Sequence, residues 1–186
     1  MPRHKMISDE RVLDLLFDAI LETGPEGLTF ALAAKACALS PATLVQRYGS
    51  RLNLVEAVLL RAWDRLQTET EAADAEEALT PRGAVELLMR LMPPQDAERN
   101  ATNGLLLLRE DIRNPNLRAR GAHWGRTLAI ALGRRLCSDQ NRAERLGWQM
   151  AAVWQGAQTW WAFTREQKPE DGIRRMLEDW LETVTP

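Results

Sequence analysis

Histidine and cysteine are scarce in this sequence of 186 residues. It holds two histidines, His4 and His123, and two cysteines, Cys37 and Cys137. Two histidines exclude a multi-histidine metal site, and cysteines so far apart form neither a CxxC motif nor the spacing of zinc ligands. We therefore expect no metal or other cofactor, and reduced thiols in a cytoplasmic protein.

Strand patterns and membrane segments are also missing. Runs of alternating β-branched residues do not occur, and the first ten residues, MPRHKMISDE, lack the apolar stretch of a signal peptide. Residues 146–164 carry no charge, but they include Gln149, Gln155 and Gln158, and their tryptophans are spread along the stretch. Because amide side chains are costly in lipid, we expect a helix buried inside protein and no membrane contact.

Helical periodicity fills most of the chain. Leu13, Leu16, Ile20 and their neighbours recur at the spacing of one helix face. Similar stripes, N-cap residues and Gly or Pro breaks predict about nine helices, the fourth ending near Thr70. The sequence therefore predicts an all-α fold. We expect a helix-turn-helix DNA-binding domain of three helices over residues 1–52, and a larger helical regulatory and dimerisation domain over residues 53–186.

The segment 39–51, LSPATLVQRYGSR, follows a short helix that Thr29 can cap. Ser40 is a good N-cap for the next helix, and proline is tolerated at its first position. Two short helices around a tight turn form a helix-turn-helix. In DNA-binding versions the second helix enters the major groove, which requires small or hydrogen-bonding residues outside. The outward candidates are Pro41, Ala42, Thr43, Gln46 and Arg47.

These residue types suit DNA. Glutamine can pair with adenine and arginine with guanine, while alanine and threonine methyl groups can contact thymine. Thr29, Ser40 and Arg51 lie at helix N-termini, where hydroxyls and cations suit phosphates. Arg3 and Lys5 could form a basic arm, or a solvated tail. The alternative for the whole segment is a pair of ordinary capped surface helices.

Charge favours the DNA interpretation. Between Glu26 and Glu56 the sequence holds the bases Lys35, Arg47 and Arg51 and no acid, although the whole chain has a net charge of −2. A basic island in an acidic chain is typical of a localised phosphate contact.

These residues resemble the N-terminal pattern of the TetR family of bacterial transcription regulators. The matching positions are Gly24, Thr29, Ala34, Ser40, Thr43, Leu44, Tyr48, Ser50 and Leu54. Alanine replaces the family's turn glycine at Ala38, and valine replaces a phosphate-contacting tyrosine at Val45. The resemblance adds Tyr48 to the DNA-binding candidates. It implies a homodimeric repressor, released from a palindromic double-stranded operator by a small hydrophobic or aromatic effector.

The resemblance also implies a ligand cavity between the middle helices and a dimer formed by the last two long helices. The long helix that contains residues 146–164 is apolar on more than one face, which indicates that other helices pack against more than one of its sides. A partner subunit could provide one of these contacts, but the core of a monomer could also provide all of them. The ligand candidates are Met89, Met92, Leu108, Trp124, Trp154, Gln155, Gln158 and Trp161. The dimer candidates are Trp148, Ala151, Gly156, Trp160, Ile173, Leu177, Trp180 and Leu181.

Two other function classes are compatible with an all-α chain. An all-α enzyme could use Cys137, His123 or the acids Glu110 and Asp111, but these show no nucleophile–base spacing, and we expect no enzyme. A helical DNA-organising or adaptor dimer without an effector is the main alternative. It would have a filled C-terminal core, whereas an effector-responsive regulator would have an open cavity.

Overall fold

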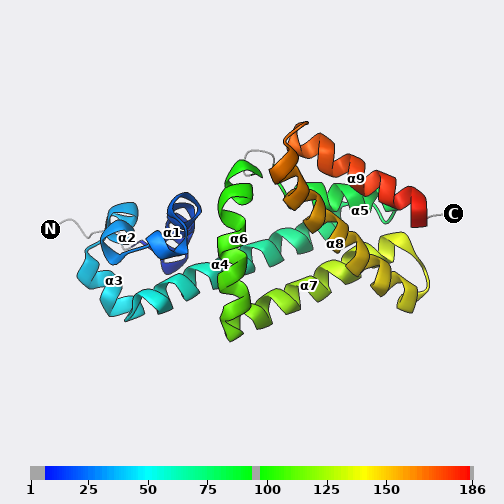
Figure 1. The fold of residues 1–186 in the computed structure, drawn as a ribbon. Helices are drawn as coiled ribbons and strands as arrows, with labels where there is room; N and C mark the ends of the chain where they lie inside the picture. The colour runs from blue at the N-terminus through cyan, green and yellow to red at the C-terminus, as the bar shows by residue number, and fades with distance from the viewer. Residues whose placement is uncertain (1–6, 94–96, 185–186) are drawn as a thin grey trace. The chain divides into compact units, whose positions relative to one another are not determined.

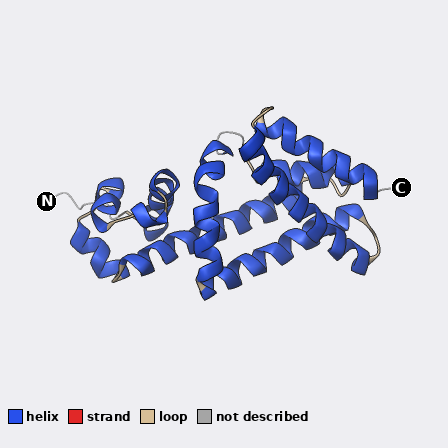
Figure 2. Cartoon of the chain, viewed as in Figure 1, coloured by secondary structure: helices blue, strands red, loops and turns tan. Residues whose placement is uncertain are grey.

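The computed structural model describes residues 7–93 and 97–184. These ranges contain nine α-helices and one short 3-10 helix, η1, and no strand (Figures 1 and 2). The predicted all-α class is therefore confirmed. The chain forms two compact units. Unit 1 comprises the described residues up to Arg65 together with Asn103–Arg118, and unit 2 comprises Leu66–Thr102 together with the described residues from Ala119 on.

Unit 1 is built from short, capped helices. Ser8, Thr29 and Ser40 each accept a hydrogen bond from a backbone N–H in the first turn of the helix that follows. The caps at Thr29 and Ser40 confirm the helix starts predicted there, because capping is a local property of the sequence. The elements of unit 1 are α1 (Asp9–Thr23), η1 (Pro25–Gly27), α2 (Phe30–Cys37), α3 (Pro41–Tyr48), the beginning of α4 (Arg51–Glu76), the end of α6 (Ala97–Arg113) and the beginning of α7 (Pro115–Leu136).

The core of unit 1 draws on both of its chain segments. Leu16, Ile20, Leu44 and Leu54 are completely buried in one cluster. Leu117 belongs to the same cluster, although it lies more than fifty positions further along the chain than Leu54. The helices of the first 65 residues therefore do not complete their core by themselves.

Unit 2 contains the rest of α4, α6 and α7 together with α5 (Pro81–Arg90), α8 (Gln140–Thr164) and α9 (Pro169–Val184). Helix α9 packs against both α8 and α5 (Figure 1). Leu88, Met92, Leu132, Met150 and Leu177 are almost fully buried in its core. The two compact units do not show where a functional domain begins or ends. The predicted domain boundary after residue 52 therefore stays a prediction.

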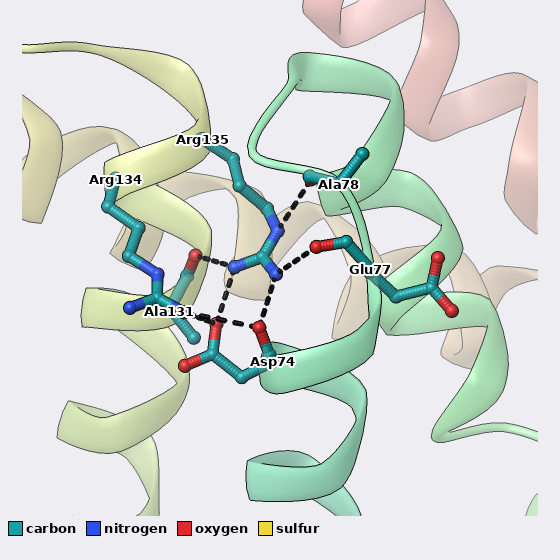
Figure 3. Close-up of polar contacts among 6 residues, drawn as sticks. All are labelled: Asp74, Glu77, Ala78, Ala131, Arg134 and Arg135. Atoms are coloured by element: carbon teal, nitrogen blue, oxygen red, sulfur yellow. Dashed lines mark hydrogen bonds and ion pairs between the residues drawn. The ribbon is translucent and has the colours of Figure 1, made fainter.

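A buried arginine fixes the end of α4 in unit 2 (Figure 3). The Arg135 side chain on α7 is completely buried and pairs with the Asp74 carboxylate. Its guanidinium also donates to the backbone carbonyls of Asp74, Glu77 and Ala78, at 2.8, 2.9 and 3.1 Å respectively. These groups include carbonyls that a helix end leaves without an intrahelical partner. Arg135 therefore acts as a C-cap supplied from a distant part of the chain.

The predicted end of α4 near Thr70 is wrong, because the helix continues to Glu76. Thr70 and Ala73 are completely buried, and Arg135 satisfies the carbonyls at the helix end. Burial of the residues after Thr70 and capping by Arg135 thus keep this segment helical, and neither contact can be read from the local sequence pattern.

Candidate nucleic-acid interface and ligand pocket

The α2–turn–α3 geometry is fixed by local contacts. Thr29 Oγ1 accepts from Leu32 N at 3.2 Å, and Ser40 Oγ accepts from Thr43 N at 3.0 Å. Between the two helices Ala38 adopts a left-handed conformation, with a φ of 53°. This conformation favours glycine, so an alanine here costs about 1 kcal/mol. The turn is therefore held by the helices around it.

Helix α3 presents small and polar side chains on its outer face. Pro41, Ala42 and Gln46 are exposed, whereas Leu44 is completely buried and anchors the helix to the core. Thr43 is half-buried, and its hydroxyl hydrogen-bonds with Ser40 Oγ at 2.8 Å. An outer face of this kind allows close approach of a helix backbone to base edges.

Arg47 is not directed freely outward. Its Nη1 lies 2.8 Å from Asp9 Oδ1 at the start of α1, and the side chains are 24% and 74% exposed respectively. This pair was not predicted from the sequence. No local signal links two residues 38 positions apart.

Tyr48 faces the interior more than the surface. The residue is half-buried, and its hydroxyl is buried without a hydrogen-bond partner in the described ranges. Burial raises the pKa of Tyr48, and the nearby Asp9 carboxylate adds to this. Burial also raises the pKa of the neighbouring Cys37 thiol. Tyr48 therefore supports α3 from behind, and a direct role in DNA contact stays a prediction.

Arg51 contacts the backbone near the end of α1. Its Nη1 donates to the carbonyl of Pro25 at 2.9 Å and more weakly to that of Glu26 at 3.4 Å. A guanidinium has five N–H donors, so this contact leaves others for a phosphate. Ser50 caps α4 by accepting from Asn53 N at 3.1 Å. Arg3 and Lys5 lie outside the described residues.

The end of α6 contacts α1 and α4 within unit 1. Asn103 Nδ2 donates to the carbonyl of Leu21 at 2.6 Å, and Trp63 Nε1 on α4 donates to Asp111 Oδ1 at 2.9 Å. Burial raises the pKa of Asp111, which the hydrogen bond from Trp63 only partly offsets. Leu108 lies in this segment and is 40% exposed. The other ligand candidates belong to unit 2, and a ligand role for Leu108 stays a prediction.

An open cavity of about 230 Å³ lies between α7 and α8. Of the predicted ligand residues it includes Trp124, Trp154 and Gln155. Met92 is buried in the core and Met89 packs against it. The remaining lining residues, which the ligand prediction did not include, are Gly125, Leu128, Trp148, Ala151 and Ala152.

Two other ligand candidates have different surroundings. The Gln158 side chain donates to the carbonyl of Trp154 on its own helix, at 3.5 Å. Trp161 lines a second open cavity, of about 290 Å³, beside the turn between α8 and α9. Its Nε1 donates to the carbonyl of Gln167 at 2.9 Å.

The predicted dimer residues fall into two groups. Ile173, Leu177 and Leu181 are buried in the chain's own core, so their side chains are not available to a second copy. Trp180 and Ala151 are half-buried against that core, and Trp148 is 44% exposed beside the cavity.

The other dimer candidates lie at an exposed apolar surface. Trp160 is 63% exposed, and its ring centroid lies 6.0 Å from that of Phe163, which is 74% exposed. On α9, Met176 is 43% exposed and lines the second cavity together with Trp160. A side chain added at Gly156 would meet no other atom. We call Trp160, Phe163 and Met176 the apolar patch.

Residues 7–93 and 97–184 show neither a metal site nor a membrane span. No cluster of His, Cys, Asp and Glu there could hold a metal ion. None of the helices in residues 7–93 and 97–184 is long and apolar enough to span a bilayer.

Comparisons with known proteins identify the fold. No protein-family model and no curated protein matches the chain. A transcriptional regulator from Rhodococcus matches with a TM-score of 0.79 at 18% identity, over 96% of both chains. A TetR transcription regulator from Haloarcula marismortui matches with a TM-score of 0.76 at 16% identity, over 96% of this chain and 99% of that one. A TetR-family regulator from Streptomyces coelicolor matches with a TM-score of 0.72 at 18% identity, over 96% and 83%.

Proposed function

We propose that this chain, which has the fold of TetR-family transcriptional regulators, is itself a DNA-binding transcriptional regulator. It acts as a homodimeric repressor that a small hydrophobic or aromatic effector releases from a palindromic operator. The observation that carries the proposal is the capped α2–turn–α3 unit, whose outer face exposes Pro41, Ala42 and Gln46. Because α3 is anchored by the buried Leu44, this face is held in one orientation.

Base reading and phosphate binding are assigned to different side chains. Gln46 is exposed on α3 and can pair with adenine. Arg47 can pair with guanine once its ion pair with Asp9 breaks and its side chain turns toward the base. Arg51 already binds backbone carbonyls, and its remaining donors suit a phosphate beside the N-terminus of α4.

Dimerisation through the apolar patch would produce the symmetry of a palindromic operator. Trp160, Phe163 and Met176 expose large apolar side chains next to one another on α8 and α9. Contiguous exposed apolar surface marks interaction sites. A two-fold dimer places two recognition helices on two half-sites about one DNA turn apart.

The open cavity between α7 and α8 favours an effector-responsive regulator over a DNA-organising dimer with a filled core. A ligand that binds one arrangement of the dimer better than another shifts the population toward it. If that arrangement separates the recognition helices differently, linkage lowers the affinity for the operator.

Selection of bound duplexes from a random DNA pool, at physiological salt, tests the DNA function first. We expect a palindromic consensus. Arg47→Ala should then change the preferred bases, whereas Arg51→Ala should weaken binding to every duplex. Arg145→Ala removes an exposed charge from unit 2 and is the matched control, expected to change neither. Sequence-blind binding by the unaltered protein would contradict the regulator proposal.

A further inference from the structure

The exposed face of α3 is mostly apolar. Its exposed residues are Pro41, Ala42, Val45 and Gln46, and only the last of these has a side chain that forms hydrogen bonds. At 3.6 residues per turn, Ala42 and Val45 lie in the middle of this face. Pro41 and Gln46 lie at its two edges. The surface that the proposed function assigns to the bases therefore presents methyl groups at its centre.

Val45 is both exposed and held in place. The residue is 44% exposed, whereas the preceding Leu44 is completely buried. The Val45 carbonyl accepts from the N–H of Gly49, the C-cap of α3, at 2.8 Å. A valine in a helix has one strongly preferred rotamer, so a contact made by its methyl groups costs little side-chain entropy.

A single exposed apolar residue is ordinary on a protein surface. Val45 differs because Ala42, three positions earlier and on the same side of the helix, extends its apolar surface. Neither side chain can pair with the hydrogen-bonding groups of a base edge. Their contribution to base recognition must therefore come from apolar contact.

The major groove of DNA offers one apolar group to such a contact, the 5-methyl group of thymine. The modified base 5-methylcytosine carries the same group at the same position of its ring, whereas uracil and cytosine lack it. The centre of the exposed face of α3 therefore matches a 5-methylpyrimidine.

We infer that Val45, with Ala42 beside it, contacts the 5-methyl group of a pyrimidine in each half-site and is a specificity-determining residue. The inference rests on the proposed function, in which Gln46 and Arg47 form hydrogen bonds with bases, and adds an apolar contact to it. The half-site then combines an adenine, which Gln46 can bind, with a neighbouring 5-methylpyrimidine.

Deoxyuridine isolates the contribution of the methyl group. It differs from thymidine only by the loss of this group, and it still pairs with adenine. Each thymine of the duplex selected from the random pool is replaced in turn, and the affinity of the full chain is measured by fluorescence anisotropy. Burial of one methyl group corresponds to about threefold to fourfold in affinity. We expect a loss of this size at one thymine position of the half-site.

Cytosine and 5-methylcytosine, each paired with guanine, are then compared at the same position. We expect the methylated base to bind more tightly by a similar factor, because the same group is added. The affinities of the thymine and 5-methylcytosine duplexes show which carrier of the methyl group the protein prefers.

Two substitutions assign the effect to one side chain. Val45→Ala removes two methyl groups from an exposed position and keeps a residue that favours helix, so it should remove most of the preference for thymine over deoxyuridine. Leu52→Ala is the control, because Leu52 is 71% exposed in the first turn of α4, outside α3. It should preserve the preference. Circular dichroism verifies that each variant is folded.

Several results would overturn the inference while a recovered palindrome leaves the regulator function standing. These are no response to deoxyuridine at any thymine, equal binding of cytosine and 5-methylcytosine at the responding position, or an unchanged preference in Val45→Ala. An equal loss of preference in Leu52→Ala would also overturn it. If the unaltered protein binds all duplexes alike, the proposed function fails and the inference fails with it.

Discussion

Replacing Arg135 by methionine should destabilise unit 2 strongly. The side chain is completely buried, and its guanidinium makes five hydrogen bonds, to one carboxylate oxygen and four backbone carbonyls. Methionine fills a similar length without a donor. The carbonyls of Asp74, Glu77 and Ala78 would then lose this partner at the end of α4.

The expected loss in the free energy of unfolding depends on which polar groups have no partner in the Arg135→Met variant. Breaking a buried ion pair by removing one partner costs about 3–5 kcal/mol. Here the Asp74 carboxylate keeps its contact with Arg134 at 2.7 Å. The loss therefore comes mainly from the carbonyls, and we expect about 3 kcal/mol, the lower end of that range. For a chain of this length, that corresponds to a fall in melting temperature of about 6–12 °C.

Thermal and urea unfolding followed by far-UV circular dichroism measure the effect. Arg134→Met is the matched control, because Arg134 contacts the same acid but is 47% exposed. Exposed ion pairs contribute at most about 1 kcal/mol. If the two variants lose similar stability, the interpretation of Arg135 as a buried cap is wrong.

Three further predictions concern unit 1 and the apolar patch. Asp9→Asn removes a carboxylate from beside Arg47 and should raise affinity for DNA of any sequence about threefold, with a steeper dependence on salt, as measured by fluorescence anisotropy. Burial raises the pKa of Asp111 in the folded protein, so the stability linked to this group is complete below its unfolded pKa and is lost as pH rises through the folded pKa. Asp111→Asn, which can still accept from Trp63, should therefore raise the melting temperature at neutral pH, and the gain should disappear below about pH 4. Trp160→Glu should shift the protein from dimer to monomer in analytical ultracentrifugation, whereas a substitution of the exposed Ile130 on α7 should not.

Much of the fold could be predicted because its determinants are local. The N-caps at Ser8, Thr29 and Ser40 depend on side chains within three residues of the N–H groups that they bind. The breaks at Gly24 and Gly49 coincide with positive φ angles of 73° and 74°. Such features are encoded by short sequence patterns, which need no knowledge of the tertiary structure.

The details of the site could not be predicted, since they depend on residues far apart in the sequence. Arg47 meets Asp9 across 38 positions, and Arg135 meets the end of α4 across about 60. Helical periodicity shows which face of a helix is apolar, but it does not show which other helix that face packs against. For the same reason the sequence could not show that Leu108 belongs to unit 1 or that Ile173 is buried in the core of unit 2.

The discontinuous composition of unit 1 has a consequence during synthesis. Its second segment, Asn103–Arg118, follows the first by nearly forty residues and supplies Leu117 to its core. At translation rates of about 5–20 residues per second, the ribosome needs roughly 3–10 seconds to proceed from Arg65 to Arg118. During that interval α1, α2 and α3 have been made without Leu117, which completes their core, and the first helices of unit 2 are already being made. The nascent chain is therefore expected to complete the folding of unit 1 only after the synthesis of unit 2 has begun.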